Sequence, residues 1–335
     1  MKDTSAKIPY SILDLATVTE DATIQETFSK SLELAQYAEQ LGYHRYWLSE
    51  HHNMISVASS ATSILIGYIA GGTSKMRVGS GGIMLPNHSP LAVAEQFGTL
   101  ESIYPGRIDL GLGRAPGTDQ LTAMELRGTR FSTAEDFPQN ILKLQTFFSK
   151  DNSDAKVRAI PGEGQNIPIW ILGSSTDSAQ LAGYLGLPYA FASHFAPAQF
   201  YAAIELYHKT FRPSPSLEKP YFMPCVNVIA ADTDEEANRL ATSLYQMFMG
   251  IITGKRTRLQ PPVENMHELW TDYEEEAARQ MLQLSLIGSP ETIKLKVKSL
   301  YENTGMNEIM VISNIYDQKA KLYSYKLFAD VVRDF

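Results

Sequence analysis

Residues 76–112, MRVGSGGIMLPNHSPLAVAEQFGTLESIYPGRIDLGL, contain one strand, one helix and a second strand in sequence order. The runs 76–79 and 107–112 are short and rich in apolar residues, which predicts strands. Between them, residues 91–104 carry apolar side chains at helical spacing, which predicts a helix. A strand, a crossover helix and a second strand form the unit from which parallel sheets are built.

The same alternation runs along the rest of the chain. Eight strands, each followed by helix, in 335 residues predict a (β/α)8 TIM barrel, and a doubly wound sheet is the second possibility. We expect one domain over residues 1–335, with insertions near 115–166 and 254–270 at the C-terminal face of the barrel. The predicted strands are 8–15, 46–48, 76–79, 107–112, 169–172, 189–192, 222–231 and 308–313.

Composition excludes several classes of partner. The chain has 37 acidic and 29 basic residues, a formal charge of −8, and no long basic run, which argues against nucleic acid and against an anionic membrane surface. One cysteine, Cys225, excludes an intramolecular disulfide framework. No apolar stretch is long enough for a membrane helix, and the N-terminus lacks a signal sequence. We therefore expect a soluble cytoplasmic protein that acts on a small molecule.

If the chain is a barrel, function should lie just after the strands. The second strand is followed by residues 49–53, SEHHN. Neighbours in extended chain point in opposite directions, so His51 and His52 should not share a metal, and the other histidines lack ligand spacing. We expect no metal site. His51 is a candidate catalytic group, or else a hydrogen-bonded structural residue.

Glycine-rich and hydroxyl-rich turns follow the next three strands. Gly81 and Gly82 follow the third strand and indicate either a bulge or the close approach of a flat ligand. Arg114 lies in the turn 111–117, GLGRAPG, which is not a dinucleotide-binding pattern and suits either an anion or a surface ion pair. The fifth strand leads into residues 173–178, GSSTDS, typical of a helix N-cap and also of a phosphate cradle.

Together these stretches resemble the bacterial luciferase-like flavin monooxygenases. The resemblance is carried by SEHHN at 49–53, VGSGGIMLP at 78–86, PGRIDLGLGR at 105–114 and GSSTDSAQLA at 173–182, and it extends through 186–195 to 286–291. It implies a TIM barrel that binds reduced flavin mononucleotide (FMN) at its C-terminal face. It also implies insertion of one oxygen atom from O2 into a small substrate, often an aldehyde.

The resemblance also implies roles for single residues. His51 matches the catalytic histidine of luciferase, and Arg114 matches the arginine that contacts the flavin phosphate. A cis peptide under the flavin ring would join Gly81 to Gly82, where luciferase has two alanines. The remaining predicted cofactor contacts are in the turn after the fifth strand, where luciferase has glutamate at the position of Ser174: Gly173, Ser174, Ser175 and Ser178.

Two other functions remain open within the same fold. One is an oxidoreductase that uses a deazaflavin (F420) and transfers hydride without oxygen, and the other is a protein that only binds flavin. For the monooxygenase we expect a separate flavin reductase as partner, and segments 115–135 and 254–270 are candidates for a lid. We also expect a homodimer, because the predicted helix at 58–69 is apolar around most of its circumference. Its apolar residues are Ala61, Ile64, Leu65, Ile66, Tyr68, Ile69 and, just after it, Ala70.

Overall fold

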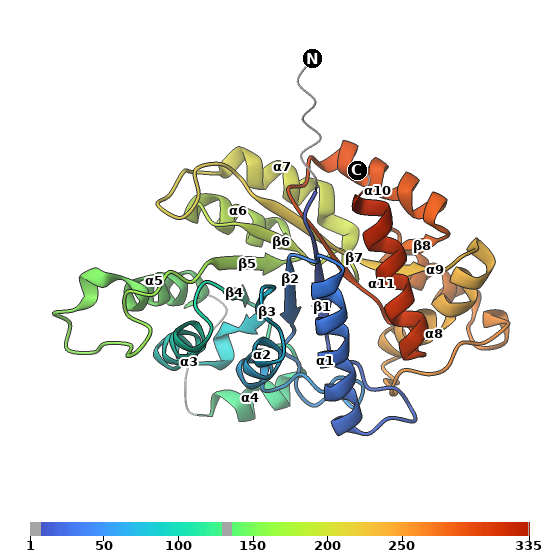
Figure 1. Ribbon diagram of the computed structural model, residues 1–335, viewed down its shortest axis with the longest axis horizontal. Helices are drawn as coiled ribbons and strands as arrows, with labels where there is room; N and C mark the ends of the chain where they lie inside the picture. The colour runs from blue at the N-terminus through green and yellow to red at the C-terminus, as the bar shows by residue number, and fades with distance from the viewer. Residues whose placement is uncertain (1–7, 129–135, 334) are drawn as a thin grey trace, which may run out of the picture.

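The computed structural model describes residues 8–128, 136–333 and 335. Within them, eight parallel strands close into a barrel surrounded by helices, which confirms the (β/α)8 prediction (Figure 1). Each strand pairs with its neighbour in the chain from β1 to β7, and β9 closes the ring between β7 and β1. The barrel strands are β1 (Tyr10–Asp14), β2 (Arg45–Leu48), β3 (Arg77–Met84), β4 (Ile108–Gly113), β5 (Ile169–Gly173), β6 (Tyr189–Phe191), β7 (Phe222–Ala230) and β9 (Ile309–Ile312).

The helices cover the outer surface of the strands, and many are capped by side chains already recognisable in the sequence. Thr23, for example, forms a capping box with Glu26 at the start of α1. The helices are α1 (Ile24–Gln40), α2 (Thr62–Gly71), α3 (Pro90–Ile103), α4 (Gln120–Arg127), α5 (Phe137–Phe148), α6 (Thr176–Leu185), α7 (Phe200–Thr210), α8 (Asp234–Thr253), α9 (Asp272–Met281), α10 (Pro290–Thr304) and α11 (Gln318–Arg333).

A buried ion cluster fills the N-terminal end of the barrel. The guanidinium of Arg45 donates to Asp109 Oδ2 at 2.6 Å and to both carboxylate oxygens of Glu308, at 2.8 and 3.0 Å. Arg77 donates to the other oxygen of Asp109 at 2.6 Å. Because the carboxylates of Asp109 and Glu308 are fully buried, they depend on these arginines for compensation. The cluster therefore ties β2, β3 and β4 to the residue that precedes β9, at the end of the barrel opposite the predicted site.

Three local features differ from the sequence-based expectation. Strand β3 does not end at Gly79 but continues to Met84, with a shift of its register against β4 between Ser80 and Ile83. Helix α4 occupies part of the insertion that we expected to hold only the helix at 137–148. A short strand, β8 (Leu286–Gly288), was not predicted and pairs with the C-terminal part of β7. Residues 129–135 of the first insertion lie outside the described part of the chain.

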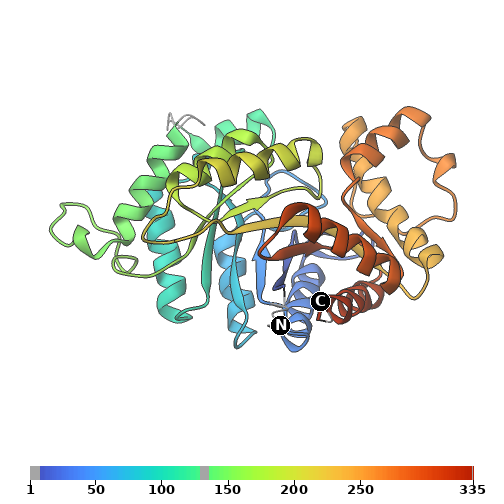
Figure 2. The same cartoon turned by 90° about the horizontal axis from the view of Figure 1, so that it is seen from above.

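The chain between β7 and β8 forms an excursion beside the barrel. Figures 1 and 2 show α8 and α9, in orange, projecting on the side opposite α5, in green. After α8, the segment returns to the barrel mouth, where Leu259 makes a β-bridge to Thr19 in the loop after β1. No helix within the described ranges is long and apolar enough to cross a membrane.

Candidate functional site

The predicted site residues all lie at the C-terminal end of the barrel. His51 follows β2, the Gly81–Gly82 step is inside the extended β3, and Arg114 follows β4 directly. The turn of Gly173 to Ser178 joins β5 to α6. Because parallel strands place their C-terminal ends at one mouth, four separate stretches of sequence converge there.

The Gly81–Gly82 peptide bond is cis, as predicted. It lies where β3 changes register against β4. A Cβ on Gly82 would lie 2.7 Å from the backbone oxygen of Gly111, so no other residue fits without moving strand β4. Neither residue of the step therefore carries a side chain, and Gly82 is buried against the backbone of β4.

Arg114 reaches the N-terminal end of α6. Its Nη2 lies 3.6 Å from Asp177 Oδ2 in the first helical turn, and the two side chains are 45% and 72% exposed. In this solvent-exposed position the ion pair contributes little to stability. The structure thus brings the predicted phosphate-binding arginine to a helix N-terminus, where partial positive charge and backbone N–H groups favour an anion.

The serines of this turn have different surroundings. Ser175 is the N-cap of α6, and its hydroxyl accepts from the Ser178 backbone N–H at 3.4 Å, while Ser174 next to it is half-buried. The Ser178 hydroxyl is buried and donates to the Ser175 carbonyl oxygen at 2.8 Å. A Cβ on Gly173 would lie 2.1 Å from that hydroxyl oxygen, so Gly173 makes room for Ser178. The buried Ser178 therefore stabilises the turn through its hydrogen bond to Ser175, whereas Ser174 and Ser175 are partly exposed at its surface.

Glu50 connects the ends of β2 and β3. Its carboxylate, 1% exposed, lies 2.9 Å from His52 Nε2, 2.9 Å from His88 Nε2 and 2.9 Å from the backbone nitrogen of Met84. A carboxylate can only accept, so both imidazole Nε2 atoms carry protons. Burial alone would raise the pKa of Glu50, but these hydrogen bonds outweigh it and lower the pKa to about 2. Glu50 is thus a buried anion that holds the strand carrying the Gly81–Gly82 step.

His51 and His194 form a pair of uncharged imidazoles at the mouth. Burial, with the nearby positive charge of Arg256, lowers the pKa of His51 to about 4. Burial and the nearness of His51 lower the pKa of His194 to about 3, against a partial offset from the Cys225 backbone. The Nδ1 atom of His194 is buried with no well-formed hydrogen bond to any described residue. At neutral pH both rings are therefore neutral and able to accept protons.

His52 faces away from His51, as expected from its neighbouring position. Its ring is bound to Glu50, whereas Nδ1 of His51 lies 3.1 Å from Ser49 Oγ. Pattern analysis named His51 but assigned no role to Glu50 or His194, although both lie in the quoted stretches. For Glu50 the available signal was its position next to His51, and only the fold shows which groups Glu50 and His194 contact.

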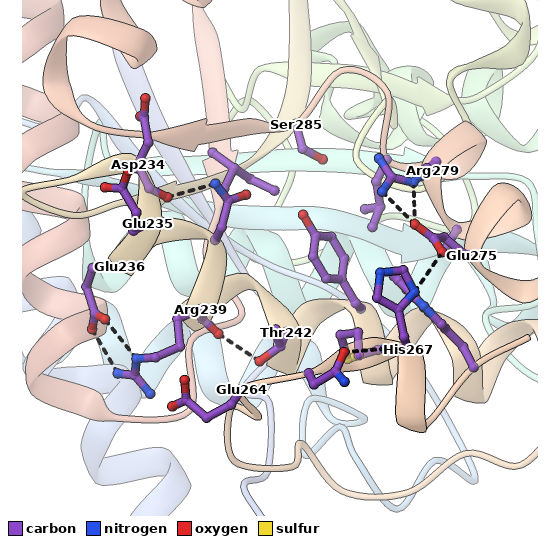
Figure 3. Close-up of a pocket in the computed structure, with 18 of the residues that line it drawn as sticks. Asp234, Glu235, Glu236, Arg239, Thr242, Glu264, His267, Glu275, Arg279 and Ser285 are labelled. Carbon is purple, nitrogen blue, oxygen red and sulfur yellow. Dashed lines mark hydrogen bonds and ion pairs between the residues drawn. The ribbon is translucent and has the colours of Figure 1, made fainter. Parts of the chain in front are cut away.

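A hollow of about 1030 Å³ lies in the excursion, between α8, α9 and β8 (Figure 3). Its charged side chains largely neutralise one another: Arg239 pairs with Glu236 at 2.8 Å, and Arg279 pairs with Glu275 at 2.6 Å. None of the predicted site residues lines it. The convergent, incompletely paired groups are at the barrel mouth, and the mouth is the candidate active site.

Comparison with known proteins gives matches over nearly the whole chain. Residues 8–308 match a family model described as luciferase-like monooxygenase. A "Luciferase-like monooxygenase" of Escherichia coli is 50% identical over 328 residues, covering 98% of each chain. An "N-acetyl-S-alkylcysteine monooxygenase" of Bacillus subtilis is 32% identical over 335 residues, covering 97% of this chain and 98% of the relative.

Solved structures agree with the fold. The crystal structure of apo-MsnO8 has a TM-score of 0.86 at 33% identity, covering 97% of this chain and 98% of that one. More distant barrels with a TM-score of 0.72 include a Baeyer–Villiger monooxygenase in complex with FMN, at 18% identity, and an F420-dependent secondary alcohol dehydrogenase, at 15%. At such identities the likeness shows the fold alone.

Proposed function

This chain belongs to the luciferase-like monooxygenase family, and on that premise we propose that it uses reduced FMN and O2 to oxidise a small organic substrate. The observation that carries the proposal is the convergence at one mouth of an arginine, a helix N-terminus, a bare glycine step and a neutral histidine. Reduced flavin, when bound, supplies the electrons for oxygen chemistry. A separate reductase in the cytoplasm would supply it, since the chain lacks a dinucleotide-binding pattern.

The residues of the mouth fit an FMN molecule. Arg114, the α6 N-terminus and the hydroxyls of Ser174 and Ser175 would hold the phosphate, with Ser178 and Gly173 shaping the turn. A phosphate there would compete with Asp177 for Arg114, because the two are 3.6 Å apart. A flat ring would lie against β3 at the Gly81–Gly82 step, where neither residue carries a side chain. His51, neutral at pH 7, would hold or accept a proton next to the reacting atoms.

The name of one relative suggests a class of substrate. The monooxygenase of Bacillus subtilis is named for N-acetyl-S-alkylcysteines, and we propose a small molecule with an oxidisable sulfur or carbonyl carbon for this chain as well. Deazaflavin is the second candidate cofactor, because the same phosphate cradle would suit it. The monooxygenase names at 50% and 32% identity favour FMN, since hydride transfer from deazaflavin does not use oxygen.

Flavin titration tests the proposal. FMN, riboflavin and F420 are each titrated into the parent and into Arg114→Ala, followed by absorbance and fluorescence. Loss of a charge-assisted phosphate contact costs about 1.5–3 kcal/mol, roughly 10- to 150-fold in affinity, and the half-exposed position of Arg114 favours the lower end. Riboflavin, which lacks phosphate, should bind both proteins alike.

Arg158→Ala is the matched control, because Arg158 also forms an exposed ion pair, with Glu163 at 2.7 Å, far along the chain from the mouth. It should bind FMN like the parent. If FMN and riboflavin weaken equally in Arg114→Ala, the phosphate is held elsewhere. If F420 binds and FMN does not, the hydride-transfer function replaces the monooxygenase.

We also propose that the protein is a homodimer through α2. The helix buries Leu65, Ile66 and Ile69 against its own barrel. It leaves Ile64 72% exposed and Tyr68 43% exposed on its outer side. Large apolar side chains on the outer face of an already packed helix are typical of a surface that meets another subunit.

A further inference from the structure

His51 is connected to the carbonyl of Leu15 by two buried hydroxyls. Its Nδ1 lies 3.1 Å from Ser49 Oγ, Ser49 Oγ lies 2.9 Å from Ser59 Oγ, and Ser59 Oγ lies 3.0 Å from the Leu15 carbonyl oxygen. Ser49 is 2% exposed and Ser59 is fully buried. Four atoms from the loops after β1 and β2 thus form one chain of contacts that ends on the imidazole.

The direction of the protons along this chain follows from counting donors. A carbonyl oxygen has no proton, so Ser59 must donate its single hydroxyl proton to Leu15. Ser59 then has none left for Ser49, so Ser49 donates to Ser59. Ser49 in turn has none left for the imidazole, and the third contact can form only if His51 Nδ1 carries the proton.

We propose that Ser49 and Ser59 are positioning residues that hold His51 in the tautomer with its proton on Nδ1, which leaves Nε2 as the proton-accepting atom of the site. The proposal rests on the proposed function only for the use of Nε2 in oxidation. The tautomer itself is a property of this chain without flavin or substrate.

Backbone contacts make the same arrangement rigid. The His51 backbone N–H donates to the Ser59 carbonyl oxygen at 3.0 Å, and Thr62 Oγ1 donates to the Ser49 carbonyl oxygen at 2.9 Å. Ser59 therefore contacts His51 directly through its main chain and indirectly through its side chain, by way of Ser49. A histidine whose second nitrogen is bound in this way keeps one tautomer and one ring orientation, as is seen for histidines that bind metals.

The experiment reads the tautomer directly. Protein labelled with ¹⁵N at histidine is examined by long-range ¹H–¹⁵N spectroscopy at pH 7, with and without FMN, and His51 is assigned by its absence in His51→Ala. The parent should show the Nδ1–H form. Ser49→Ala removes the acceptor and Ser59→Ala frees the Ser49 proton to point at the ring, so both should lose the pure Nδ1–H signal. Ser49→Thr retains a hydroxyl and should restore it.

Ser193→Ala is the matched control, because Ser193 is also a buried serine at the mouth, and its hydroxyl donates to the Cys225 carbonyl oxygen at 2.7 Å. It should lose a similar hydrogen bond without changing the His51 tautomer. In turnover, Ser49→Ala should reduce product formation roughly 10- to 100-fold, the usual range for a partner that orients a histidine, with FMN affinity unchanged.

An Nε2–H signal in the parent would overturn the proposal, and so would an unchanged Nδ1–H signal in Ser49→Ala. Both outcomes can be read without any oxidation of a substrate by the protein. If His51 carries its proton on Nδ1 but the protein fails to bind FMN, the tautomer proposal stands and the proposed function is rejected. If the protein binds FMN normally but His51 carries its proton on Nε2, the tautomer proposal is rejected and the proposed function stands.

Discussion

Replacing Glu50 by glutamine tests whether this carboxylate organises the mouth. The substitution keeps the size of the side chain but removes the charge that His52, His88 and the Met84 N–H all contact. A glutamine amide has one oxygen, and its NH2 group would face groups that themselves donate. Lowering the pKa from 4.5 to about 2 corresponds to about 3 kcal/mol of stabilisation at neutral pH, so Glu50→Gln should lose about 2–3 kcal/mol.

The pH dependence has a definite sign. The pKa of Glu50 is depressed in the folded protein, so its contribution is fully present above the unfolded value of 4.5 and is lost as pH falls toward 2. The difference in unfolding free energy between the parent and Glu50→Gln should therefore be constant between about pH 5.5 and 8 and should shrink below pH 4.5. Urea denaturation at a series of pH values measures it, and FMN titration measures the effect on the mouth.

Glu39 provides the matched control. It is a carboxylate whose oxygens accept from the backbone nitrogens of Ser74, Lys75 and Met76, at the opposite end of the barrel, and its pKa is also lowered. Glu39→Gln should destabilise the protein without changing FMN affinity, whereas Glu50→Gln should also weaken FMN several-fold, because Met84 follows the Gly81–Gly82 step. The reasoning is refuted if both variants weaken FMN equally, or if Glu50→Gln is as stable as the parent.

Four further substitutions test other parts of the structure. His51→Ala should leave FMN affinity within a few-fold and reduce product formation by roughly 10²–10⁴ in an assay with added reductase. His52→Ala removes one hydrogen-bond partner of Glu50 and should mainly reduce stability. Turnover like the parent's in His51→Ala would reject the catalytic role. Arg45→Met should cost about 3–5 kcal/mol in urea denaturation, since it leaves the carboxylates of Asp109 and Glu308 buried, and a loss below 1 kcal/mol would contradict this. Ile64→Glu should convert a dimer to a monomer in light scattering, and a parent that is already monomeric would disprove the dimer.

The barrel could be predicted because its evidence is local. Each strand and helix has its own hydrophobic period, and the order of elements then leaves few folds. Strand β8 was missed because three residues carry no period, and Leu286–Gly288 form a strand only by pairing with the end of β7. Helix α4 was missed although Asp119 caps it, accepting from the Thr122 N–H at 3.0 Å, because the glycines and prolines around it dominated the pattern.

The sequence could predict the candidate site by one rule alone: in a parallel barrel, residues that follow a strand lie at the mouth. That rule placed His51, Arg114 and the turn of Ser175, each of which directly follows a strand. It could not assign a role to Glu50, which depends on a contact with His88, 38 residues away. Nor could it assign one to His194, which follows β6 but lies near His51, which follows β2. Contacts between loops of different strands are set by the closure of the barrel, and no spacing within a single loop encodes them.

The predicted site residues at the mouth differ in exposure and in charge. Arg114 and the N-terminus of α6 are open to solvent, where a cation can exchange Asp177 for another anion at little cost. His51 and His194 are half-buried, and their partial removal from water keeps both rings uncharged at neutral pH. Among the described residues, Glu50 is the carboxylate whose charge acts on His51, and it is itself bound to three other residues. Under the proposed function His51 is the group placed to accept a proton, and we propose that the hydroxyls of Ser49 and Ser59 determine which of its two nitrogens accepts it.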